Sequence, residues 1–143
     1  MKLSSETIEV LKNFSNINQN ILIKEGNVVR TMSVMKNILA EATINEPFPQ
    51  EFGIYDLTEF LGVMTLASDA DIEFDNDSFL TINGGSAKIK YFFSDPSILI
   101  SPPDTFNAPE TDINFVISQD TMQNILKASA VMQLPDVVIN KTQ

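Results

Sequence analysis

Apolar side chains near the start of the chain recur at helical spacing. They stand every three residues and would share one face of a helix, the residues being Ile8, Leu11, Phe14 and Ile17. Just before them, Ser4 can accept hydrogen bonds from the free amides of a first helical turn. The pattern predicts an amphipathic helix that begins after Ser4.

The period then changes to that of strands. Residues 20–33 are typical of two strands that turn at 25–27, where Gly26 allows positive φ. A second turn near 35–37 leads into a third strand at 38–45, and Pro47 and Pro49 are expected to interrupt its ladder.

A second helix is predicted after a short strand at 52–56. Asp56 and Glu59 have capping-box spacing, and apolar residues follow at helical intervals: Leu57, Phe60, Leu61, Met64 and Ala67. Gly62 inside a helix costs roughly 1 kcal/mol relative to Ala, so a close packing contact is expected there.

Alternation returns from 70 to 93 and predicts a strand meander with a turn at Gly84-Gly85. Its first part carries the densest run of acids: Asp69, Asp71, Glu73, Asp75 and Asp77. A calcium loop would need a central Gly and a terminal Glu that this run lacks. Ile72 and Phe74 alternate with the acids, which favours a strand with an acidic edge.

Four of the seven prolines fall in 94–112, which predicts an extended, comparatively stiff connector. A strand at 113–117 is expected next, followed by a third helix that Ser118 caps and Pro135 ends, and by a last strand at 136–140. Helices and strands are segregated rather than strictly alternating, so the fold class predicted is α+β with antiparallel sheets.

The chain begins in the same way twice. SSETI at 4–8 and SQDTM at 118–122 share an opening Ser, an acid, a Thr and an apolar residue. Self-similarity at a long offset indicates one structural unit used twice. The second copy holds 26 residues, from Ser118 to Gln143, so the chain is expected to be a fragment.

Composition limits the chemistry. The chain of 143 residues is 43% hydrophobic and has no Cys and no His, which excludes disulfides, Cys/His metal sites and Ser-His catalysis. We expect no enzyme activity, catalytic residue, cofactor or metal. No apolar run is long enough to span a membrane. A net charge of −10 argues against nucleic acid unless the nine cations are placed together.

Several stretches resemble the sliding clamps of large tailed bacteriophages, the processivity factors of phage DNA polymerases. They are MKLS at 1–4, LKNF at 11–14, AEATI at 40–44, YDL-x-x-FLG at 55–62 and DPS at 95–97. The resemblance implies the DNA-clamp fold, with helices packed on antiparallel sheets and two domains in each subunit. It implies a first domain at 1–93, a connector at 94–112 and the start of a truncated second domain at 113–143.

The resemblance also implies that helices face duplex DNA. Lys12 and Lys127 would then project onto one concave face, with Lys2 and Asn16 as weaker DNA-facing candidates. The alternative for each is an ordinary solvated side chain. Connectors of clamps border an apolar pocket for polymerase and loader peptides, so Ile98, Leu99 and Phe106 are candidate partner contacts or simply cover the domain seam.

The function implied is a subunit that encircles DNA, slides, and tethers the replicative polymerase in the cytoplasm of an infected bacterium. Full-length subunits would close into a ring of three; this chain is expected to be unable to close a ring alone. The apolar face of its third helix would be covered by another copy, or the tail would be mobile; that face comprises Met122, Ile125, Leu126 and Met132. The alternative function is an acidic α+β interaction module unrelated to replication.

Overall fold

The chain divides into two units, Met1–Thr105 and Phe106–Gln143. A computed structural model describes residues 1–67, 69–107 and 110–140. The unit boundary falls inside the predicted connector, in which residues 108–109 lie outside the described part. Residues 141–143 of the predicted second domain also lie outside it. The domain boundaries drawn from the sequence stay a prediction.

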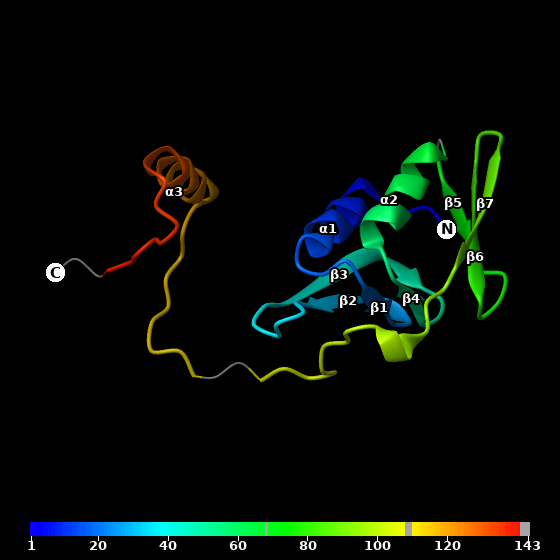
Figure 1. Cartoon of the computed structure of the whole chain (residues 1–143), viewed down its shortest axis with the longest axis horizontal. Helices are drawn as coiled ribbons and strands as arrows, with labels where there is room; N and C mark the ends of the chain where they lie inside the picture. Colours follow the sequence, from blue (N-terminus) through cyan, green and yellow to red (C-terminus); the bar gives the residue numbers. More distant parts are fainter. Residues whose placement is uncertain (68, 108–109, 141–143) are drawn as a thin grey trace. The chain divides into compact units, whose positions relative to one another are not determined.

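Unit 1 contains two α-helices and seven strands in the described residues (Figure 1). In chain order they are α1 (Ser5–Ser15), β1 (Ile21–Ile23), β2 (Gly26–Met32), β3 (Leu39–Phe48), β4 (Phe52–Ile54), α2 (Leu57–Leu66), β5 (Asp71–Glu73), β6 (Phe79–Gly84) and β7 (Ala87–Phe92). All strand pairs are antiparallel, in the orders β1-β4, β2-β3 and β5-β6-β7. The predicted α+β class is confirmed.

The two helices of unit 1 lie side by side and pack on the strands (Figure 1). The predicted apolar face of α2 is buried throughout, and α1 buries Leu11 and Phe14. Between the sheets, Phe48, Phe52 and Phe74 meet edge to face, with ring centroids 5.2–6.4 Å apart. Burial of this apolar surface is the main force that holds unit 1 together.

Both predicted caps of unit 1 are confirmed. The Ser4 hydroxyl accepts the Thr7 amide at 3.3 Å, and the Asp56 carboxylate accepts the Glu59 amide at 2.9 Å. The meander is also confirmed, because β5, β6 and β7 pair in sequence order and the turn between β6 and β7 uses Gly85 at φ +58°.

Two details of the strands differ from the prediction. β1 does not form a hairpin with β2; it pairs with β4 instead, and Gly26 at φ +108° turns the chain into a separate sheet. Pro47 does not end β3, which continues to Phe48. The predicted interruption of the ladder at Pro47 does occur, because the register shifts between the pairs Gly26–Phe48 and Val28–Thr43. Such an irregularity tolerates a proline, which has no amide hydrogen to donate.

The prediction of a close packing contact at Gly62 is wrong. A Cβ placed there would meet nothing within 4 Å, because the residue faces open space on α2. The close approach occurs instead at Gly53 on β4, where a Cβ would lie 2.5 Å from the Ser94 carbonyl oxygen and 2.6 Å from Leu99 Cδ1. Gly53 therefore allows the following segment to cross β4.

That segment is the first half of the predicted connector, and it is docked rather than freely extended. It contains a short 3-10 helix, Pro96–Ile98, and its amides at Ser94 and Ile100 bond the Gly53 carbonyl and the Asn20 side chain, each at 2.9 Å. Lys24 and Arg30 both bond Asp104 farther along. Residues 94–104 thus belong to the packing of unit 1.

Unit 2 contains one helix in its described residues, α3 (Gln119–Met132). Ser118 caps it as predicted, and the helix ends three residues before Pro135, with Gln133 in the left-handed conformation. The next residues fold back along α3 and line a small apolar pocket of about 210 Å³. The strands predicted at 113–117 and 136–140 are absent from the described part of unit 2, because a strand needs a pairing partner and that part supplies none.

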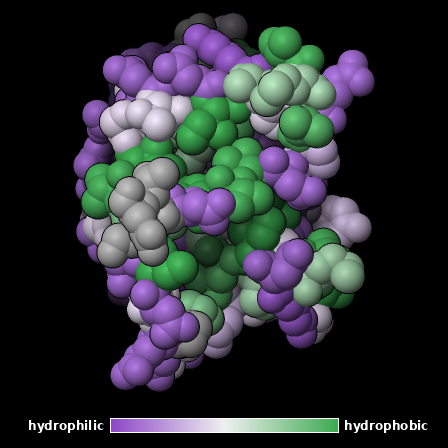
Figure 2. All heavy atoms as spheres, turned by 90° about the vertical axis from the view of Figure 1, so that its left-hand side faces the viewer, coloured by the Kyte–Doolittle hydropathy of each residue, from purple (hydrophilic) through white to green (hydrophobic). Residues whose placement is uncertain are grey.

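No residue of α3 is buried. The face of the molecule drawn in Figure 2 carries apolar side chains in the open among polar ones. Within unit 2, exposed apolar residues include Met122, Leu126, Val131 and Met132 of α3. Within unit 2, the described residues therefore leave this apolar face of α3 largely uncovered.

Candidate nucleic-acid interface

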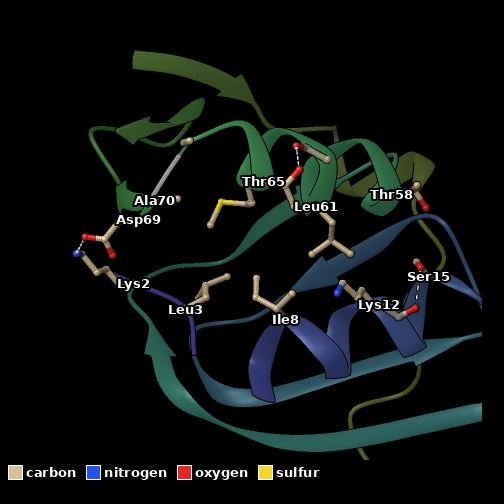
Figure 3. Close-up of a pocket in the computed structure, with 13 residues that line it drawn as sticks. Lys2, Leu3, Ile8, Lys12, Ser15, Thr58, Leu61, Thr65, Asp69 and Ala70 are labelled. Atoms are coloured by element: carbon tan, nitrogen blue, oxygen red, sulfur yellow. Dashed lines mark hydrogen bonds and ion pairs between the residues drawn. The ribbon is translucent and has the colours of Figure 1, made fainter. Parts of the chain in front are cut away.

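An open groove of about 660 Å³ runs between α1 and α2. Leu3, Ile8 and Leu61 point toward one another across it (Figure 3). Lys2 with Asp69 lies at one end and Lys12 with Ser15 at the other. The groove therefore has an apolar middle and one lysine at each end.

Lys12 is exposed near the end of α1. Its ammonium donates to Glu9 Oε1 at 2.8 Å, one helical turn earlier. Its carbonyl oxygen accepts hydrogen bonds from the Ser15 hydroxyl at 2.8 Å and from the Asn16 amide at 3.2 Å. The structure thus brings Lys12 and Asn16 together, with the Asn16 side chain engaged in closing the helix end.

Lys2 lies before α1, and its ammonium is paired with Asp69 Oδ2 at 2.5 Å. The hydrogen bond that Lys2 donates to Asp69 raises the pKa of Lys2 above its ordinary value. Lys2 and Lys12 line the same groove, so the structure joins two of the lysines selected from the sequence.

Lys127 lies on α3 in unit 2 and is exposed. Among the described residues it forms no ion pair, and Asn124 occupies the position three residues before it. Because Lys12 and Lys127 belong to separate units, their sharing of one face remains a prediction.

The candidate partner residues of the connector are in different surroundings. Ile98 is 59% exposed, whereas Leu99 is buried and packs over Gly53. Phe106 is exposed and lies at the start of unit 2. Leu99 thus covers the core of unit 1, and only Ile98 and Phe106 present apolar surface.

The acidic run makes individual bonds instead of a cluster. Asp71 accepts from the amino group of Met1 at 2.6 Å, and this hydrogen bond lowers the pKa of Asp71. Asp75 accepts the Thr81 hydroxyl. In residues 1–67, 69–107 and 110–140 no group of acids could hold a metal ion. Ile72 is buried on β5, an edge strand, which confirms the predicted strand with an acidic edge.

One residue that sequence reasoning missed is Glu46 on β3, which completes the cap of α1. Its carboxylate accepts the Ser4 amide at 2.8 Å and the Thr7 hydroxyl at 2.6 Å. Burial alone would raise its pKa, but these hydrogen bonds outweigh burial and leave the pKa below its ordinary value. Glu46 is about 40 residues from the helix it caps, so no local signal marks it.

Glu9 and Asp69 were also missed as partners of the two groove lysines. Glu9 could have been found, since residues three apart on a helix are neighbours. Asp69 follows α2 and meets Lys2 only through the tertiary fold.

None of the described helices has the length and apolarity needed to cross a membrane.

Comparison with known proteins adds a family. A family model described as DNA polymerase processivity factor matches residues 3–100. Over 97% of this chain, a sliding clamp of Vibrio phage KVP40 is 35% identical. Sliding clamps of Escherichia phage RB69 and Enterobacteria phage T4 are 31% and 32% identical over the same share. The chain spans 61–64% of the length of these relatives. These matches give no support to an interaction module outside replication.

Proposed function

The chain belongs to the DNA polymerase processivity factor family, and we propose that its helical face is the DNA-facing surface of a sliding clamp. The observation that carries this proposal is the family match over residues 3–100, which includes both helices of the groove. In this role the chain binds duplex DNA without reading sequence and catalyses no reaction.

The charges of the chain are compatible with this role. A net charge of −10 opposes tight binding to phosphate, but lysines at both ends of the groove offer local cations. Phosphate contacts position a protein on DNA and carry no sequence information. A clamp that is held by encirclement needs only weak contacts of this kind, so Lys2 and Lys12 suffice for unit 1, with Asn16 as a neutral neighbour.

Unit 2 would supply the corresponding helix of a second domain, with Lys127 facing the same DNA. We assign the first domain to 1–93, the connector to 94–112 and the second-domain start to 113–143. A full-length subunit would form a closed ring with two further copies of itself, in the cytoplasm of the infected bacterium. The polymerase and the clamp loader would dock near the connector, where Ile98 and Phe106 are exposed.

The test measures binding of the chain to fluorescently labelled duplexes of two unrelated sequences across a salt series. Lys12→Gln should weaken binding equally for both sequences and reduce the salt slope by about 1, as expected for one lost phosphate contact. Lys127→Gln should act similarly.

The matched controls are Lys36→Gln and Lys88→Gln, which remove the same charge from exposed residues outside the groove. Equal losses in the controls and in Lys12→Gln would mean that only net charge matters and would overturn the assignment of this surface. Absence of binding at low salt, by the wild-type chain and by every variant of it, would overturn DNA binding by this chain.

A further inference from the structure

Both lysines of the groove are already paired within the chain. Lys12 is bonded to Glu9 at 2.8 Å and Lys2 to Asp69 at 2.5 Å. All four side chains are at least half exposed, from 53% to 80%. Exposed ion pairs are weak and open readily, so each carboxylate binds its lysine reversibly.

The pairs leave the groove without net charge. Among its lining residues, Lys2 and Lys12 are the cations and Asp69 is an anion, and Glu9 is bonded to Lys12 from the adjacent turn of α1. Two positive and two negative groups cancel. A phosphate that approaches either lysine must displace a carboxylate or share the ammonium with it.

The third helix shows that such pairing is not a general property of these helix lysines. Lys12 has Glu9 three residues before it, whereas Lys127 has Asn124 at that spacing. Among the described residues, Lys127 forms no ion pair. The chain therefore carries one helix lysine with a built-in anionic partner and one with a neutral amide in its place.

We propose that Glu9 and Asp69 compete with DNA phosphate for Lys12 and Lys2 and thereby weaken the hold of unit 1 on DNA. This inference rests on the proposed DNA-facing function of the groove. Opening each pair offsets part of the attraction between lysine and phosphate, and the carboxylate that is released repels the backbone. The consequence is a surface whose contacts with DNA are weak and short-lived, as sliding requires.

The experiment compares duplex binding by the wild-type chain and by the double variant Glu9→Gln/Asp69→Asn. The control is Glu51→Gln/Asp77→Asn, which changes the net charge equally at exposed residues that do not line the groove. At low salt the variant Glu9→Gln/Asp69→Asn should bind the duplex about 3–10-fold more tightly than the control variant does. Its log-log salt slope should steepen by up to about 1 for each lysine released.

The reverse change is made on α3. Asn124→Glu places an acid three residues before Lys127 and should weaken binding about 2–5-fold. Asn140→Glu adds the same charge outside the helix and serves as its control. Circular dichroism of every variant checks folding, and Glu9→Gln alone repeats the test without changing the contact between Lys2 and Asp69.

The outcomes separate the two proposals. If the wild-type chain binds DNA and the groove variants equal their controls, the competition is overturned while the proposed function stands. If only the groove variants bind, the competition is supported in its strongest form. If no variant binds at low salt, the DNA-facing function fails, and the competition fails with it.

Discussion

Helices α1 and α3 begin with the same local structure and have different surroundings. In each, a Ser hydroxyl accepts the amide three residues later, at 3.3 Å for Ser4 and 3.2 Å for Ser118. The same Ser hydroxyl also bonds the following Thr hydroxyl, at 3.1 Å in α1 and 2.8 Å in α3. The repeated sequence thus produces the same cap twice.

The difference lies in what covers each helix. Leu11 of α1 is 0% exposed, and Glu46 from β3 adds two further bonds to its cap. In unit 2, α3 has no buried residue, and Leu126 is 60% exposed. A cap decides where a helix starts, but packing against other elements supplies most of its stability.

The largest test of this contrast makes the same substitution in both helices. Leu11→Ala should lower the free energy of unfolding of unit 1 by about 2–5 kcal/mol, because it leaves a cavity in the core. Leu126→Ala, which is in unit 2, should change the free energy of unfolding by no more than about 0.5 kcal/mol, since the side chain is largely exposed. Urea denaturation followed by circular dichroism measures both. A large loss for Leu126→Ala that grows with protein concentration would mean that α3 is covered by another copy in solution.

The second test removes the bonds that β3 gives to α1. Glu46→Gln should cost about 1–2 kcal/mol at pH 7, because the charge-assisted bonds to Ser4 and Thr7 are weakened in a partly exposed setting. The lowered pKa of Glu46 means that folding favours its ionised form. This stabilisation is therefore present above the ordinary value of 4.5 and is lost as the pH falls through the folded-state pKa.

The measurement is the unfolding free energy of wild type and variant from pH 7 down to acid. The gap between them should close below the ordinary pKa of 4.5. Glu51→Gln, an exposed carboxylate just before β4, is the matched control and should leave no gap. A gap that stays constant with pH would show that the contribution of Glu46 does not depend on its charge.

The smallest test concerns α2, the helix that packs beside α1. Gly62→Ala should stabilise unit 1 by about 0.5–1 kcal/mol, because the new methyl meets nothing within 4 Å and helix propensity improves. Thermal denaturation measures the gain, which should leave the helicity of α3 unchanged. Gly53→Ala is the opposing control, since its methyl would collide with Ser94 and Leu99. Destabilisation by Gly62→Ala would refute the open space seen at that residue.

Local signals predicted the elements well where one residue and its near neighbours make the structure. The caps at Ser4, Asp56 and Ser118 each depend on a bond that spans three residues. The meander of β5, β6 and β7 pairs neighbours in sequence, so its order could also be predicted. Lys12 was selected through the family resemblance, and the structure shows that Lys2 lines the same groove.

The failures involve partners that are distant or missing. Pairing of β1 with β4 joins residues more than 25 apart, and a hairpin with β2 was equally compatible with the local pattern. The segments 113–117 and 136–140 have the composition of strands but form none in the described part of unit 2. The backbone groups of a strand form their hydrogen bonds with a neighbouring strand, so the sequence of one segment alone cannot guarantee that it forms a strand.

The sequence therefore determined where helices begin and which of their faces are apolar, since these depend on residues within one or two turns. The choice of lysines as candidates for phosphate came from the family resemblance. Only the tertiary structure decided that Glu46 closes the cap of α1, that Gly53 admits the connector, and that Asp69 holds Lys2. Burial and ion pairing arise between segments brought together by folding. For that reason two helices with the same opening have different environments and hold their lysines differently.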